Sequence, residues 1–223
     1  IPNKGLMVMT VSRIKTGVLA FCFIGPFSYA QALKIPDNIV MTESEKTLVG
    51  QGEIIVRELS TKAKAGQTFE AVGVANAPLA TLIQIITNYD KYPEFMPNVS
   101  DVATLEQVGN ATVLGFTLDL PLGKVKKYRI LISMLESDPE TARIEWTSQP
   151  WPGLKPAETI VETSGYWLLI SRSSKSTLLL YHVYTDPGPI PFGLEWIVDI
   201  LSKNSIPEAL LKTRERAEQL TRE

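Results

Sequence analysis

The chain has 223 residues, of which 44% are hydrophobic and 21% charged, as is typical of a soluble globular protein with one sizeable core. One His and one Cys are too few for a zinc site of the usual kind, and we expect neither a metal nor a cofactor. The formal net charge of −2 provides no basic surface that would neutralise phosphates, so we expect no nucleic-acid partner.

The first 32 residues have the pattern of a secretory signal peptide. Arg13 and Lys15 precede a short apolar run at 17–29, and small residues follow at 30 and 32. We therefore expect cleavage after Ala30 or Ala32 and a periplasmic or secreted protein. The alternative is a retained membrane anchor, although the run is shorter than the about 20 residues that span a bilayer.

Removal of this leader makes the chain more acidic. Its 32 residues carry three basic side chains and no acidic one, so the remainder has 19 basic and 24 acidic residues. Such a chain is poorly suited to electrostatic adsorption on anionic lipids, and transient membrane contact would have to use apolar side chains. The sequence indicates no particular oligomeric state.

The regular elements begin after a connector. Residues 33–49 are mixed in character and are interpreted as a connector that ends in a helical turn. Residues 53–59 and 68–76 are rich in β-branched side chains and predict a β-hairpin. Residues 77–97 change to helical spacing, with one more short helix at 92–95.

A run of six further strands follows, joined by turn-forming segments. The predicted strands are 100–108, 111–120, 124–135, 142–149, 162–173 and 177–185. Their spacing is typical of an antiparallel meander.

The C-terminus is predicted to be helical. Residues 194–201 are apolar on nearly every side and should be buried. Ser205 and Glu208 have the spacing of a capping box that opens a last helix. The expected inward stripe of this helix is Ile206, Leu210, Thr213, Ala217 and Leu220. The order of elements predicts an α+β protein, in which one long C-terminal helix closes the apolar face of a curved antiparallel sheet.

Two segments carry a resemblance to a known family. Residues 72–102, which include the motif Tyr-Pro-Glu-Phe-Met-Pro, and residues 188–218 resemble the START-related, polyketide cyclase-like (SRPBCC, Bet v 1-like) superfamily. The resemblance extends over about residues 50–220. It implies the helix-grip fold and a deep cavity for an apolar molecule, so we assign 50–223 to a ligand-binding domain. Similar proteins include lipid and sterol carriers, coenzyme Q-binding proteins and aromatase/cyclases.

Candidate cavity residues follow from strand alternation and from the presence of aromatic rings with polar groups. In 177–185 both faces are apolar, so alternation leaves the inward face of that strand open. The expected ligand-binding residues are Phe116, Leu118, Tyr128, Ile130, Trp146, Tyr166, His182, Tyr184 and Trp196. The expected partner is a small hydrophobic ligand of the lipid, sterol or hopanoid, or quinone class, and the alternative is a core filled by its own side chains.

His182 is the only histidine, and histidine is the side chain that changes charge near neutral pH. One hypothesis makes it the general acid/base of an aromatase/cyclase-like enzyme. The other makes it a structural histidine on a strand. No acidic residue stands at a spacing that would place it beside His182, so we predict binding and transport and assign no catalytic residue.

Two loops could reach a ligand. Residues 186–193 contain three prolines and form either a lid over the cavity or a stiff connector. Residues 146–159 form a long excursion in which Trp151 is a candidate for contact with ligand or membrane. The basic run at 124–127 is interpreted as a solvated strand face.

Overall fold

A computed structural model describes residues 6–9, 39–59, 66–189 and 200–223. Within them, nine strands form one antiparallel sheet in the order β1-β2-β3-β9-β8-β7-β6-β5-β4. The strands are β1 Leu6–Met9, β2 Ile54–Glu58, β3 Gln67–Ala75, β4 Val99–Val108, β5 Ala111–Leu120, β6 Lys124–Ser137, β7 Thr141–Gln149, β8 Glu162–Ser173 and β9 Ser176–Asp186. From β2 onward, each strand agrees with its prediction to within two residues at either end.

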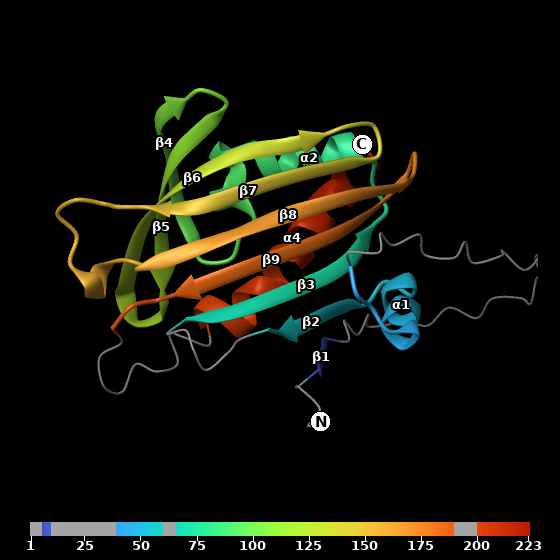
Figure 1. Cartoon of the computed structure of the whole chain (residues 1–223), viewed down its shortest axis with the longest axis horizontal. Helices are drawn as coiled ribbons and strands as arrows, with labels where there is room; N and C mark the ends of the chain where they lie inside the picture. The colour runs from blue at the N-terminus through green and yellow to red at the C-terminus, as the bar shows by residue number, and fades with distance from the viewer. Residues whose placement is uncertain (1–5, 10–38, 60–65, 190–199) are drawn as a thin grey trace, which may run out of the picture.

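The last six strands form the predicted meander, and the sheet is completed by pairing β3 with β9. This pairing joins elements about a hundred residues apart in the chain. It is reinforced by the Thr177 hydroxyl, which donates a buried hydrogen bond of 2.9 Å to the carbonyl oxygen of Ala77. Strands β4 to β9 therefore all lie on the side of β3 opposite to β2, with β9 next to β3 and β4 at the far edge (Figure 1).

The helices are α1 Glu43–Gly50, α2 Leu79–Thr87, the 3₁₀ helix η1 Tyr89–Glu94 and the long α4 Ser205–Leu220. A π-helical turn, η4 Ile200–Asn204, leads directly into α4. Short 3₁₀ turns, η2 Pro121–Gly123 and η3 Pro156–Glu158, lie in two loops. Figure 1 shows α2 and α4 crossing behind the sheet. The predicted buried helix at 194–201 lies almost entirely outside the described residues.

The predicted capping box at the start of α4 is wrong. Asn204 already has helical backbone angles, because η4 runs on into α4 and leaves no free helix end at Ser205. The Ser205 hydroxyl instead donates to the carbonyl oxygen of Ile200 and accepts a 3.0 Å hydrogen bond from the Asn98 side chain. The predicted stripe is buried at Ile206, Leu210, Thr213 and Ala217. Leu220, in the last turn, is 38% exposed and does not belong to it.

The segment predicted as a connector contains a full helix, α1, in place of a single turn. Its first turn has a capping box, in which the Thr42 N–H donates to the Glu45 carboxylate (2.7 Å) and the Glu45 N–H donates to the Thr42 hydroxyl (3.2 Å). This box supplies partners for helix-end N–H groups that would otherwise have none. Val49 of α1 is fully buried against the sheet.

The sheet therefore has a core on each face. The inner core lies between the sheet, α2 and α4 and contains Leu82, Ile86 and Leu210. The outer core lies beneath α1 and includes Ile55 and Val72, which alternate with inward-facing neighbours. No helix among the described residues is long and apolar enough to cross a membrane. Strand β1 pairs with β2 at the edge of the sheet and lies within the segment that we expect to be cleaved.

Candidate functional site

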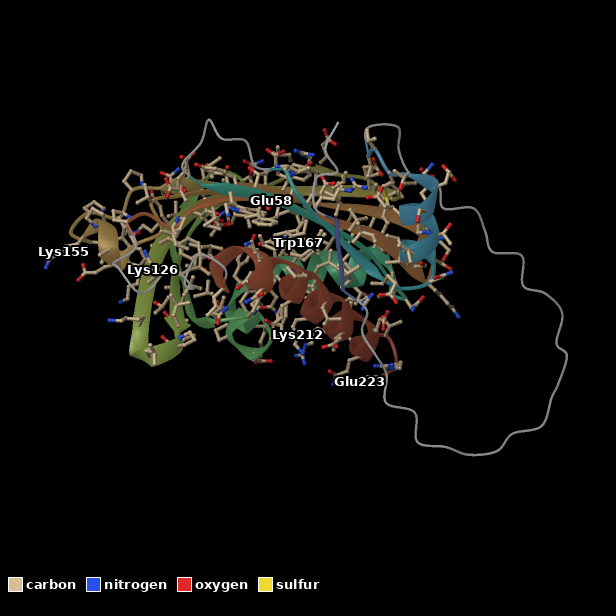
Figure 2. All side chains as sticks on the ribbon, turned by 90° about the horizontal axis from the view of Figure 1, so that it is seen from below. Glu58, Lys126, Lys155, Trp167, Lys212 and Glu223 are labelled. Carbon is tan, nitrogen blue, oxygen red and sulfur yellow. The ribbon has the colours of Figure 1, made fainter. Side chains whose placement is uncertain are left out.

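A cavity lies between the inner face of strands β5 to β9 and α4. It holds about 880 Å³ of empty space, including the solvent in its mouth. Figure 2 shows Trp167 in the layer between the sheet and α4, and Lys212 on the side of the helix that faces away from the sheet. Tertiary packing thus leaves an open space between the sheet and α4, lined by residues of the inner core.

Five of the predicted site residues stand in the wall of this cavity: Phe116, Leu118, Tyr128, Ile130 and Trp146. They come from β5, β6 and β7, where alternate positions point inward because the intervening side chains are more polar. Their position agrees with the predicted inward faces of these strands. Contact of these residues with a ligand stays a prediction.

The structure corrects the placement of three others. Tyr166, His182 and Tyr184 point to the outer face of the sheet and do not line the cavity, whereas Tyr181 and Val183 do. On β9 the assignment failed because both faces of the strand are buried, one in each core. The remaining predicted residue, Trp196, lies outside the described residues.

His182 belongs to a row of polar side chains across the outer face. Its ring stacks on Tyr166 with centroids 4.9 Å apart, and its Nδ1 lies 3.7 Å from a carboxylate oxygen of Glu70. Arg57 binds Glu70 (3.1 Å) and Glu45 of α1 (2.9 Å), which connects the row to that helix. Because the backbone of β9 separates His182 from the cavity, this imidazole is not placed to act on a molecule held inside.

Sequence reasoning missed several cavity residues. Trp167 follows Tyr166 directly on β8, so the two side chains point to opposite faces of the sheet. The sequence pattern favoured Tyr166 as the inward residue, whereas Trp167 lines the cavity. Tyr92 belongs to the motif that supports the family resemblance, yet only the structure places it in the wall. The other lining residues that were not predicted are Met96, Pro97, Asn98, Val99, Ile132, Ile160, Thr163, Tyr181, Val183, Thr185, Ser205, Ile206 and Ala209.

Aromatic rings pack against one another in the wall. Phe116 and Tyr128 stack with centroids 5.0 Å apart and planes at 8°. Trp167 and Tyr181 stack at 4.1 Å, and Trp146 lies 5.7 Å from Tyr181. Such ring pairs hold side chains in fixed orientations, so the wall is preformed.

The phenol groups of the wall differ in their hydrogen bonding. The Tyr92 hydroxyl donates to the carbonyl oxygen of Ile86 at 2.6 Å. Within the described part of the chain, the hydroxyls of Tyr128 and Tyr181 have no protein hydrogen-bond partner, although both residues line the cavity. Burial raises the pKa of both phenols, so they stay protonated and can donate hydrogen bonds.

The wall carries no charge among the described residues that line the cavity. Those residues are aliphatic, aromatic, hydroxyl-bearing or, at Asn98, an amide. Nor do the described residues contain a cluster of three or more His, Cys, Asp or Glu side chains able to hold a metal ion.

Asn98, which lines the cavity, connects two elements of the wall. Its side chain binds Ser205 at the start of α4, and its carbonyl oxygen accepts a 2.9 Å hydrogen bond from the Asp119 N–H. Asn98 has a φ of 60°, a left-handed conformation that asparagine tolerates better than most residues. The turn before β4 is thereby fastened to both the sheet and α4.

A buried lysine fastens two loops near the same end of the sheet. The ammonium group of Lys126 donates to the carbonyl oxygens of Thr159 (2.8 Å) and Pro187 (2.6 Å). Figure 2 shows Lys126 at this end, with Lys155 further out on one of the loops. Burial lowers the pKa of Lys126, and the nearby Asp186 opposes that change.

The structure gives information on part of the two loops, 146–159 and 186–193, that were candidates for ligand contact. Trp151 lies on the outer side of the sheet, where Arg129 sits 4.7 Å from the centre of its ring, and it is not part of the cavity wall. The 186–193 loop is described only as far as Pro189, so both interpretations, a lid or a stiff connector, stay open.

Comparison with solved structures shows the fold. Human STARD10 superposes with a TM-score of 0.64 at 19% identity, covering 76% of this chain and 71% of that one. A STAR-related lipid transfer protein from Xanthomonas axonopodis gives 0.60 at 14% identity, covering 75% and 93%. The Zhui aromatase/cyclase from Streptomyces sp. R1128 gives 0.57 at 15% identity, covering 70% and 96%. The curved antiparallel sheet with its C-terminal helix is thus the START helix-grip fold, as the resemblance implied.

Sequence comparisons complete the assignment. A search of curated proteins yields no match. A family model described as "Polyketide cyclase / dehydrase and lipid transport" matches residues 75–192, which is more than half of the chain and includes β4 to β9 with most of the cavity wall. The chain therefore belongs to the polyketide cyclase/dehydrase and lipid transport family.

Proposed function

We propose that this protein binds a hydrophobic molecule in the cavity and carries it through water. The observation that supports this most directly is the preformed cavity, walled by aromatic and aliphatic side chains with a few hydroxyls. Ligand sites have this character, and each CH₂ group moved from water into such a site gains about 0.8 kcal/mol. Two of the similar structures are named as lipid transfer proteins, which fits the proposal.

The first experiment is native mass spectrometry of the purified protein, followed by organic extraction. We expect a bound apolar species of defined mass. An empty protein that also binds no apolar fluorescent probe would overturn the proposal.

A matched pair of variants tests whether binding occurs in the cavity. Ala209 of α4 lines the cavity, whereas Lys212 of the same helix faces away from the sheet. Ala209→Phe should fill the space and abolish probe binding, while Lys212→Phe should leave it unchanged. Equal affinities in the two variants would place the binding site elsewhere.

A second pair addresses the enzyme alternative, since one similar structure is named as an aromatase/cyclase. His182 and Tyr181 are sequence neighbours on opposite faces of β9. For a carrier, His182→Ala should leave ligand affinity unchanged, whereas Tyr181→Ala should weaken it by removing part of the wall. Turnover of a polyketide-type substrate that disappears in His182→Ala would favour the enzyme.

We further propose that the protein is exported to the periplasm with removal of its leader. The pattern at residues 13–32 supports this. Cleavage would remove β1 but leave β2 to β9 and the whole described wall, whose first residue is Tyr92. Intact-mass measurement of the protein from periplasmic extracts should show a chain that starts at Gln31 or Leu33. A full-length mass in the membrane fraction would instead indicate an anchor.

A further inference from the structure

We propose that the cavity selects uncharged, ring-containing ligands that carry hydrogen-bond-accepting oxygens, and that Tyr128 and Tyr181 donate to these oxygens. The inference rests on the proposed binding function and concerns the chemical class of the ligand. It follows from three properties of the described wall residues: their lack of charge, the two phenols without a partner among described residues, and their flat aromatic surfaces.

The lack of charge disfavours ionised ligands. None of the described lining residues can form an ion pair with a carboxylate, phosphate or ammonium group. Moving such a group from water into an apolar space without a counterion is strongly unfavourable. An ionised fatty acid would therefore have to leave its carboxylate in the solvent at the mouth, whereas a neutral molecule can be enclosed completely.

The two phenols indicate where the ligand is polar. Tyr128 on β6 and Tyr181 on β9 face the cavity with hydroxyls that lack a partner within the described chain, in contrast to Tyr92. A ligand oxygen within reach of either hydroxyl would supply its missing acceptor, and sites with such unpaired donors discriminate against analogues that lack the acceptor.

The rings fix the orientation of these donors and favour flat ligands. Tyr128 is stacked on Phe116, and Tyr181 is stacked on Trp167, so each phenol is held by a neighbouring ring. Trp146, which also lines the cavity, lies 5.7 Å from Tyr181 and extends this aromatic surface. Fused or aromatic rings can pack on such a surface in the offset and edge-on arrangements that aromatic side chains prefer.

Three probes of one skeleton test the inference. They are anthracene, which lacks oxygen; 9,10-anthraquinone, which is neutral and has two acceptors; and anthraquinone-2-carboxylate, which is ionised at pH 7. Binding would be measured on the full protein by quenching of tryptophan fluorescence, because Trp146 and Trp167 line the cavity. We expect anthraquinone to bind about tenfold or more tightly than either of the others.

Tyrosine variants assign the selectivity to the two phenols. Tyr128→Phe and Tyr181→Phe keep the rings and remove only the hydroxyls, so they should weaken anthraquinone binding about tenfold and leave anthracene binding unchanged. Tyr166→Phe is the matched control, because its hydroxyl lies on the outer face of the sheet. This control should bind all three probes as the unaltered protein does.

The outcomes separate this inference from the proposed function. If none of the probes binds and no natural ligand is extracted, the binding function itself fails. If the three probes bind equally well and the tyrosine variants change nothing, the protein is a carrier but the selectivity proposed here is wrong. Tightest binding of the carboxylate would also overturn the inference.

Discussion

At the scale of single residues, Gly165 on β8 shows how one absent methyl group shapes the cavity wall. A Cβ at this position would lie 2.5 Å from the Trp146 side chain and 2.1 Å from the carbonyl oxygen of His182. The indole of Trp146 can pack on β8 only because Gly165 has no side chain. The position of a cavity-lining ring thus depends on a residue that contributes no side chain.

Replacing Gly165 with alanine should therefore destabilise the protein. We expect the free energy of unfolding of Gly165→Ala to fall by about 1–3 kcal/mol, the usual cost of overpacking a core. Urea denaturation followed by tryptophan fluorescence would measure it. Gly50→Ala is the control, since nothing lies within 4 Å of its added Cβ and it sits at the end of α1. Equal stabilities for the two variants would contradict this account of the packing.

Individual residues also show where the inward or outward direction of a strand side chain could be predicted from the sequence. On β5, Phe116 and Leu118 were placed correctly because Thr117 and Asp119 mark the other face as polar. On β9 no such contrast exists, because its two faces lie in different hydrophobic cores, the inner one with Leu179 and Val183 and the outer one with Leu178 and Leu180. Alternation reports which side of a strand meets water, so it cannot orient a strand that is buried on both sides.

At the scale of elements, α1 is attached to the sheet through Glu45. Burial alone would raise the pKa of this carboxyl, but hydrogen bonds from Arg57 and Thr42 outweigh it and lower the pKa below 4.5. The folded state therefore favours the ionised form. Its contribution to the free energy of unfolding is complete above about pH 4.5 and is lost as the pH falls through the lowered pKa.

Glu45→Gln should accordingly cost stability in a pH-dependent way. Loss of the cap and of the Arg57 ion pair should lower the free energy of unfolding by about 1–2 kcal/mol at pH 7. The difference from the unaltered protein should shrink as the pH falls below 4.5 in denaturation experiments. Glu43→Gln is the control, because the exposed Glu43 carboxylate forms an ion pair with Lys46 of the same helix and with no other described residue. A deficit for Glu45→Gln that is equally large at pH 3 would show that its charge is not the cause.

Lys126 also connects separate elements, because its ammonium group donates hydrogen bonds to carbonyl oxygens in two loops from different parts of the chain. Methionine at this position keeps the length of the side chain but cannot donate. In Lys126→Met we expect amide hydrogen exchange in residues 156–161 and 186–189 to accelerate about tenfold, as the loss of charged hydrogen bonds predicts. Lys124→Met, at an exposed position, should leave exchange unchanged. Unaltered exchange in both variants would mean that the loops are held by other contacts.

At the scale of the whole molecule, the architecture was more predictable than the site. Strand lengths, the hairpins and the stripe of α4 depend on local periodicity, which is written in the sequence. The cavity depends on which of two buried faces each strand turns inward and on Gly165, and these are decided by packing across the sheet. Helix α1 was underestimated because its stability comes from a cap and from the outer core more than from a long apolar stripe.

The pairing of β3 with β9 affects when the protein can fold during its synthesis. One edge of β3 pairs with the nearby β2, but its other edge pairs with residues 177–185, so the sheet cannot be completed until β9 has left the ribosome. Closing so long a loop is slow, because its entropic cost precedes the contacts that repay it. For the exported protein proposed above, this late closure would keep the chain unfolded during synthesis, in the form that a translocation channel can accept.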